Sequence, residues 1–130
     1  MSIAVRECEE ACRAHAASCL AASDKVDPHD PDREECTHLI LDCAYASSAA
    51  ARALRHFQRG DSEIAVLLTA ACAKLATRCA SACDVHRALD DCTGASRECA
   101  SACDAVLDIL GVRPVIAGVE REQMFGGSAA

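Results

Sequence analysis

Cysteine is the residue type that could do chemistry in this chain, because it occurs eleven times among 130 residues. Within each apolar stretch, neighbouring cysteines are four or seven positions apart, and these spacings keep side chains on one face of an α-helix. Thiolates are soft ligands that select Cu(I), zinc or iron–sulfur clusters. No Cys-x-x-Cys pair occurs, which weakens the zinc-ribbon and ferredoxin interpretations. The eleven are Cys8, Cys12, Cys19, Cys36, Cys43, Cys72, Cys79, Cys83, Cys92, Cys99 and Cys103.

Charge arithmetic favours Cu(I) among these metals. Zinc held by four thiolates carries a net charge of about −2, which is costly to bury several times over. One Cu(I) per thiolate is neutral, so a thiolate-bridged copper array can fill a dry interior. We therefore expect multiple Cu(I) ions per chain, with an upper capacity of about one ion per cysteine. Zinc, cadmium or silver could occupy the same thiolates in a test tube.

The remaining sequence predicts the helices that position these cysteines. Ala, Arg, Glu and Leu dominate, and only six residues are Gly. Turn signals at Pro28–Pro31, Gly60 and Asp90-Asp91 divide the chain. They predict helices over residues 3–22, 31–57, 63–88 and 90–110. Short connections predict an all-α, antiparallel up-down-up-down four-helix bundle with a Cys-lined core over 1–111, followed by a tail at 112–130.

In such a bundle the apolar stripe of each helix faces the core, so the sulfur atoms should line a common tube. Large side chains are too few to fill the interior, because the apolar fraction includes 28 Ala and 11 Cys. His15 interrupts a cysteine stripe, and we expect it to face inward as a ligand or a ligand support. An apolar plug is expected at the end opposite the Pro28–Pro31 linker, formed by Val5, Leu54, Phe57, Ile64, Leu68, Val106 and Leu110.

Composition excludes several functions. The net charge of −7 argues against nucleic-acid binding through a basic face. The apolar runs are too short to predict a membrane span, and the first residues do not resemble a secretory signal. The expected compartment is therefore the cytosol, where thiols stay reduced. No cysteine lies beside a plausible general base in a loop or at a strand end, so we predict no enzymatic activity.

Two other interpretations of the cysteines stay open at this point. Free cysteine is often a small buried residue with no further role. Cys79-x-x-x-Cys83 and Cys99-x-x-x-Cys103 also resemble the twin disulfide hairpins of small mitochondrial import chaperones, which suggests a disulfide-stapled chaperone or interaction module. That alternative leaves the other seven cysteines without a role. A thiol count on freshly purified protein would separate it from a reduced metal site.

Three cysteine pairs share the spacing C-x-x-x-C, and two of these pairs have a further cysteine seven residues before them. They are Cys8–Cys12, Cys79–Cys83 with Cys72, and Cys99–Cys103 with Cys92. Together with the inward stripes, this pattern resembles the cysteine-rich four-helix-bundle copper storage proteins of bacteria. The resemblance covers roughly residues 3–110.

The resemblance implies that all eleven cysteines bind Cu(I) and that the chain forms a homo-oligomer, usually a tetramer in that family. It implies a cytosolic member, since the exported forms carry a signal. His86 fits the place of a histidine that helps Cu(I) enter at the open end of the bundle. The chain departs from the pattern by having fewer cysteines, because Ile40, Ser47, Ala76 and Ser96 occupy stripe positions. That departure implies a lower capacity.

Overall fold

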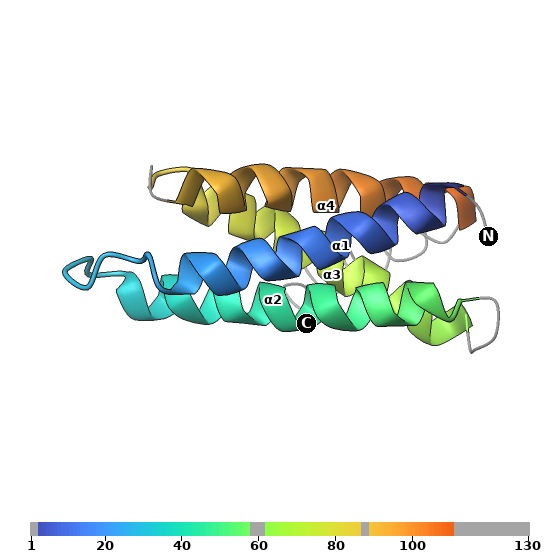
Figure 1. Ribbon diagram of the computed structural model, residues 1–130, viewed down its shortest axis with the longest axis horizontal. Helices are drawn as coiled ribbons and strands as arrows, with labels where there is room; N and C mark the ends of the chain where they lie inside the picture. Colours follow the sequence, from blue (N-terminus) through green and yellow to red (C-terminus); the bar gives the residue numbers. More distant parts are fainter. Residues whose placement is uncertain (1–2, 58–61, 87–88, 111–130) are drawn as a thin grey trace, which may run out of the picture.

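The structure is a computed structural model, and it describes residues 3–57, 62–86 and 89–110 (Figure 1). Its helices are α1 (Ile3–Ser23), α2 (Arg33–Arg55), α3 (Ser62–Cys83) and α4 (Asp90–Leu110). Consecutive helices run in opposite directions, as predicted. The tail predicted at 112–130 lies outside the described residues.

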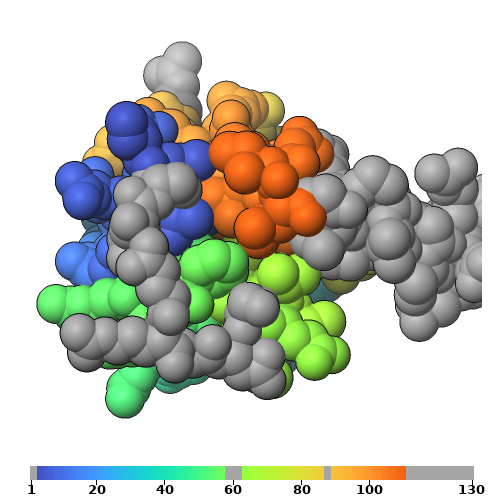
Figure 2. All heavy atoms as spheres, turned by 90° about the vertical axis from the view of Figure 1, so that its right-hand side faces the viewer, coloured from blue at the N-terminus to red at the C-terminus, as the bar shows by residue number. Residues whose placement is uncertain are grey.

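Each helix packs against two neighbours around a shared axis. α1 contacts α2 and α4, and α3 contacts the same two helices from the other side. A view along the helices shows α1, α2, α3 and α4 arranged in a square (Figure 2). The four-helix bundle predicted from the cysteine spacing is confirmed, and the inner stripe of each helix faces the other three.

One end of the bundle is closed by large apolar side chains, and we call it the apolar end. Four large side chains from α1, α2 and α4 belong to one buried cluster there: Val5, Leu54, Val106 and Leu107. This arrangement confirms most of the predicted plug. Ile64 was wrongly placed in it, because its side chain is 51% exposed. The buried stripe of α3 instead begins with two smaller residues, Ala65 and Thr69.

The opposite end, which we call the linker end, carries the loop between α1 and α2 (Figure 1). α2 begins at Arg33, two residues later than predicted, and the carboxylate of Asp30 accepts a hydrogen bond of 2.8 Å from the backbone N–H of Asp32. α3 ends at Cys83, five residues before its predicted end. The earlier end allows the chain to turn so that Leu89 is buried against the linker end.

Among the described residues, α3 is the one helix that is long and apolar enough to cross a membrane. Residues 63–83 include a window with a mean hydropathy of 1.4. This differs from the expectation that the apolar runs are too short. The helix packs against α2 and α4 with Cys72, Cys79 and Cys83 turned inward. A core helix of a bundle meets the same criteria of length and hydropathy.

Candidate metal centre

All eleven cysteines are buried, and all are free thiols. Ten are at most 1% exposed, and Cys36 at the linker end is 7% exposed. The sulfur–sulfur distances given below are all 3.5 Å or more, whereas a disulfide bond is about 2.05 Å long. The inward orientation predicted from the stripes is therefore confirmed. The disulfide-stapled alternative is not favoured, because no cysteine is bridged and the Cys79/Cys83 pair lies in a different cluster from the Cys99/Cys103 pair.

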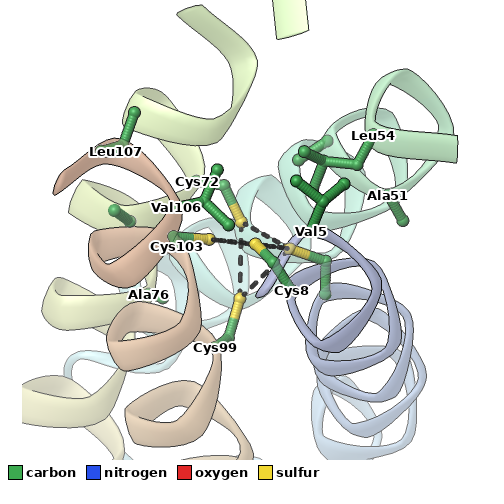
Figure 3. Packing of buried hydrophobic residues seen from close by; sticks show 13 residues of the cluster. Val5, Cys8, Ala51, Leu54, Cys72, Ala76, Cys99, Cys103, Val106 and Leu107 are labelled. Atoms are coloured by element: carbon green, nitrogen blue, oxygen red, sulfur yellow. Dashed lines mark hydrogen bonds between the residues drawn. The ribbon is translucent and has the colours of Figure 1, made fainter. Parts of the chain in front are cut away.

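Five thiols form one group next to the apolar end, and we call them the apolar-end thiols. The Sγ atom of Cys12 lies 3.8 Å from that of Cys72, 3.7 Å from that of Cys103 and 3.7 Å from that of Cys99. Cys72 and Cys99 are 3.5 Å apart, and Cys8 and Cys103 are 3.6 Å apart. Figure 3 shows the labelled cysteines of this group pointing toward one another from α1, α3 and α4. The members are Cys8, Cys12, Cys72, Cys99 and Cys103.

The other six, the linker-end thiols, lie nearer the loop between α1 and α2. The Sγ atom of Cys92 is 3.8 Å from that of Cys19, 3.7 Å from that of Cys79 and 3.9 Å from that of Cys83. The thiol of Cys43 donates to the backbone carbonyl of Leu75 at 3.2 Å. The members are Cys19, Cys36, Cys43, Cys79, Cys83 and Cys92.

Between the two groups lies a buried polar layer that consists of His15, Ser47 and Ser96. The three side chains are fully buried and come from α1, α2 and α4. His15 Nδ1 lies 2.8 Å from Ser47 Oγ, and His15 Nε2 lies 2.8 Å from Ser96 Oγ. Both ring nitrogens therefore have hydrogen-bond partners, and serine hydroxyls can donate or accept as the ring requires. The inward position expected for His15 is confirmed, and this layer divides the thiol-lined tube into two parts.

Within the described part of the chain, two sets of four ligand atoms are close enough to surround a metal ion. The sulfurs of Cys12, Cys72, Cys99 and Cys103 all lie within 4.8 Å of one another. The second set is His15 with Cys19, Cys79 and Cys92, and its ligand atoms meet the same limit. One set thus offers only sulfur, and the other offers three sulfurs and an imidazole nitrogen.

Hydrogen bonds among the thiols distribute negative charge unevenly. Sulfur donors, with Cys103 and Cys12 the strongest, lower the pKa of Cys72, and donors led by Cys19 and Cys43 lower the pKa of Cys79. Hydrogen bonds with Cys12 and then Cys72, together with burial, raise the pKa of Cys103, because a thiol that donates to a thiolate holds its proton. In each group, hydrogen bonding therefore favours the thiolate form of a cysteine on α3.

The charge of His15 depends on these thiolates. Burial lowers the pKa of the imidazole, but interactions with the sulfurs of Cys72, Cys79 and Cys99 outweigh burial and raise it to about 11. Cys72 and Cys99 are apolar-end thiols, and Cys79 is a linker-end thiol. The imidazole therefore interacts with sulfur on either side of the polar layer.

His86 lies outside the thiol core. It follows the end of α3 by three residues, and its side chain is 31% exposed. Its Nε2 atom lies 3.4 Å from Asp30 Oδ2 in the linker. The structure therefore places His86 at the linker end, as predicted, and on neither of the two four-atom sets.

Sequence reasoning missed the pairing of His15 with Ser47 and Ser96. Both serines were interpreted only as stripe positions without a thiol. Their spacing could have indicated that they face the core with His15, because Ser47 lies four residues after Cys43 and Ser96 lies four residues after Cys92. Thr69 was also missed, and its buried hydroxyl has no hydrogen-bond partner among the described residues.

Comparison with known proteins gives a family and a fold. Residues 2–108 match the model of a family described as "Copper storage protein" (Csp). Among solved structures, the chain is similar to a single-residue variant of Ccsp from Streptomyces lividans, with 28% sequence identity and a TM-score of 0.75. That similarity covers 81% of this chain and 92% of the other. No curated protein sequence matches this chain.

Proposed function

This chain belongs to the copper storage protein family, and we propose that it holds several copper ions as Cu(I) on the eleven thiols inside its bundle. The observation that carries the proposal is the convergence of eleven buried, unpaired thiols from four helices. Thiolates at 3.5–4.0 Å from one another can share bridging metal ions. We assign storage without turnover to this interior, and about one Cu(I) per thiolate is its upper capacity.

Charge supports Cu(I) over zinc. A tetrahedral zinc site with Zn–S bonds of about 2.3 Å has sulfur–sulfur edges of about 3.8 Å, so the distances alone fit zinc as well. Four thiolates around Zn(II) leave about two negative charges, however. Among the described residues, no Lys or Arg side chain is buried to neutralise them, and a protonated His15 would offset only one of the two charges. Equal numbers of Cu(I) and thiolate need no such neutralisation.

The opening for copper in this proposal is the linker end. Cys36 is the most exposed of the eleven cysteines and lies at that end, whereas the apolar end is closed by Leu54 and Val106. We propose His86 as a first contact for incoming Cu(I). The exchange of His86→Ala should slow uptake and leave the final number of bound ions unchanged.

The compartment and the assembly are further parts of the proposal. Eleven reduced thiols at short distances would oxidise in an export compartment, which supports the cytosol. A homo-oligomer, tetrameric as the resemblance implies, would cover exposed apolar side chains such as Tyr45 and Leu67. The proposed tail at 112–130 is consistent with a family match that stops at residue 108. Sedimentation velocity measures the number of subunits directly.

An anaerobic titration tests the function. The reduced apo-protein is titrated with Cu(I) in the presence of a chromophoric Cu(I) chelator, and free thiols are counted beforehand in the same sample. We expect the protein to bind many equivalents of Cu(I) before the coloured Cu(I)–chelator complex forms. Uptake of only one or two equivalents would contradict storage. A parallel titration with Zn(II) should show fewer equivalents bound, because of the charge that zinc leaves unneutralised.

A further inference from the structure

The thiols of this protein do not form one continuous array. The apolar-end thiols contact one another at 3.5–4.0 Å. Four of the linker-end thiols, Cys19, Cys79, Cys83 and Cys92, contact one another at 3.7–3.9 Å. Among the described residues, which include all eleven cysteines, no sulfur–sulfur contact within 4.0 Å joins the two groups. A Cu(I) ion bridging two thiolates in one group therefore has no thiolate of the other group within the same reach.

The polar layer is the contact between the two groups. Ser47 Oγ lies 2.8 Å from one ring nitrogen of His15 and 3.4 Å from the sulfur of Cys72, an apolar-end thiol. Ser96 Oγ lies 2.8 Å from the other ring nitrogen and 4.0 Å from the sulfur of Cys92, a linker-end thiol. His15 is thus the one metal-binding side chain, among the described residues of this layer, that faces both groups.

Apolar side chains close the bundle on the far side of the apolar-end thiols. Val5, Leu54, Val106 and Leu107 close their far side, and partly buried Leu68 and Leu110 pack against the same cluster. The linker-end thiols lie on their other side, beyond His15. Copper that comes in from the linker end therefore meets the linker-end thiols first and the polar layer second.

We propose that His15 divides the store into two compartments that fill in order, and that its imidazole transfers Cu(I) from the linker-end thiols to the apolar-end thiols. This inference rests on the proposed function, because it concerns the same copper. The starting position for transfer is the set of His15, Cys19, Cys79 and Cys92, whose ligand atoms lie within 4.8 Å of one another. The destination is the all-sulfur set around Cys12.

The transfer is a ligand exchange in which copper stays Cu(I). Bound copper neutralises the thiolates that raise the pKa of His15, so the ring first gives one proton to water or buffer. Its neutral nitrogen then binds the ion as a linker-end thiolate releases it and takes up a proton. A thiol on the far side loses its proton to water or buffer as it takes the ion. Other partners lie near the two serine hydroxyls when they leave the ring, because Ser47 Oγ is 3.4 Å from the sulfur of Cys72 and Ser96 Oγ is 4.0 Å from that of Cys92. Copper and protons balance at each step without an oxidant or a reductant.

The test is stopped-flow uptake of Cu(I) by the reduced full-length chain, followed by the ultraviolet absorbance of Cu(I)–thiolate bonds. Wild type should show a fast phase and a slower one. Iodoacetamide labelling and mass spectrometry at half loading should show protection of Cys19, Cys79 and Cys92 before Cys12 and Cys103. A single phase, or protection of both groups together, would overturn the inference.

Variants of the layer separate a transfer ligand from a structural histidine. His15→Ala should slow the second phase by about tenfold or more, the scale of losing a group that supports metal ligands, while the first phase keeps its rate. His15→Cys should restore the second phase, because a thiolate also binds Cu(I). His38→Ala, an exposed histidine of α2, should behave as wild type. An unchanged second phase in His15→Ala would overturn the proposed transfer.

A spectroscopic readout covers the case in which His15→Ala does not fold. Side-chain 15N NMR of the wild-type chain should show the ring nitrogens of His15 shifting during loading, and unshifted signals would overturn the transfer role. The titration described above separates this failure from that of the storage function. High Cu(I) capacity in one kinetic phase leaves storage intact and removes the two compartments, whereas uptake of one or two ions removes both.

Discussion

His15 Nδ1 and Ser47 Oγ lie 2.8 Å apart at the centre of the bundle, and neither side chain has any exposed surface. A buried polar group without a partner costs free energy, so the hydrogen bond between these two residues offsets the cost of burying both. Because both sit on stripes that otherwise carry thiols, the pair also determines where one thiol group ends and the next begins.

Exchange of Ser47 should therefore destabilise the apo-protein. Ser47→Ala removes the partner of a buried imidazole nitrogen, and we expect a loss of about 1–3 kcal/mol in the free energy of unfolding. Ser48→Ala is the matched control, because the neighbouring serine is exposed and should change stability by less than about 0.5 kcal/mol. Anaerobic urea denaturation measures both. Equal stability of the two variants would show that the hydrogen bond contributes nothing.

The burial of all eleven cysteines could be predicted because helical periodicity fixes it. Spacings of four and seven place residues on one face whatever the neighbouring helix is, and a bundle buries that face. The His15 layer could not be predicted in the same way. A serine on a buried stripe reads only as a missing thiol until the facing helix is known, and Ser47 and Ser96 come from two different helices.

The errors in α3 have a similar origin. No Gly or Pro follows Cys83 before the next helix, so local signals did not predict an end there. Beyond the end of the helix, Leu89 is buried in the cluster at the linker end, a long-range contact that the local sequence does not signal. Ile64 was assigned to the core from its apolar character. Its neighbour Ala65 occupies the buried position instead, in register with Thr69 and Cys72.

Copper should stabilise a fold that already exists without it. Leu54, Val106 and the alanine-rich helices pack without metal, so far-ultraviolet circular dichroism of the apo-protein should show a helical spectrum. A ligand that binds only the folded state raises stability by mass action, by about 2.7 kcal/mol for one site at a hundredfold excess over its Kd. Thermal melts with increasing Cu(I) should therefore move to higher temperature. A random-coil apo spectrum would contradict this expectation.

The apolar end should be the most sensitive part of the bundle to truncation. Leu54 is almost fully buried there, and Leu54→Ala should cost about 2–5 kcal/mol because it removes buried surface and leaves a cavity. Leu20→Ala on α1 is the control, since that side chain is 51% exposed and its loss should cost less than about 0.5 kcal/mol. Chemical denaturation of both apo-proteins gives the comparison. Similar losses would mean that the plug is not packed as described.

The apo-protein should lose stability at alkaline pH, and Cys36 should contribute to the loss. Burial, followed by the negative charge of Asp30, raises the pKa of this thiol above its ordinary value of 9.0. The contribution of Cys36 to the free energy of unfolding is fully present below pH 9. It is lost as the pH rises above 9, because the unfolded chain then releases a proton that the folded chain retains. Anaerobic denaturation at several pH values between 7 and 10.5 measures the loss.

Variants isolate the share of Cys36 in that loss. The free energy of unfolding should fall less steeply above pH 9 in Cys36→Ala than in wild type, because the variant has no thiol to titrate at this position. Asp30→Asn should lie between the two, since it removes one cause of the raised pKa and leaves burial in place. A wild-type slope in Cys36→Ala would exclude Cys36 as a source of the pH dependence.

Thr69 should be a position where the chain can be made more stable. Its side chain is 1% exposed, and its hydroxyl has no hydrogen-bond partner in the described part of the chain. Thr69→Val replaces the hydroxyl by a methyl group of similar size, and we expect the free energy of unfolding to rise by about 1 kcal/mol. Thr93→Val is the matched control on α4, because that buried hydroxyl donates to the carbonyl of Leu89 at 3.2 Å. Loss of the Thr93 hydroxyl should leave the free energy of unfolding unchanged or lower it. Equal gains in both variants would show that the added apolar group, rather than the removal of an unpaired hydroxyl, causes the effect.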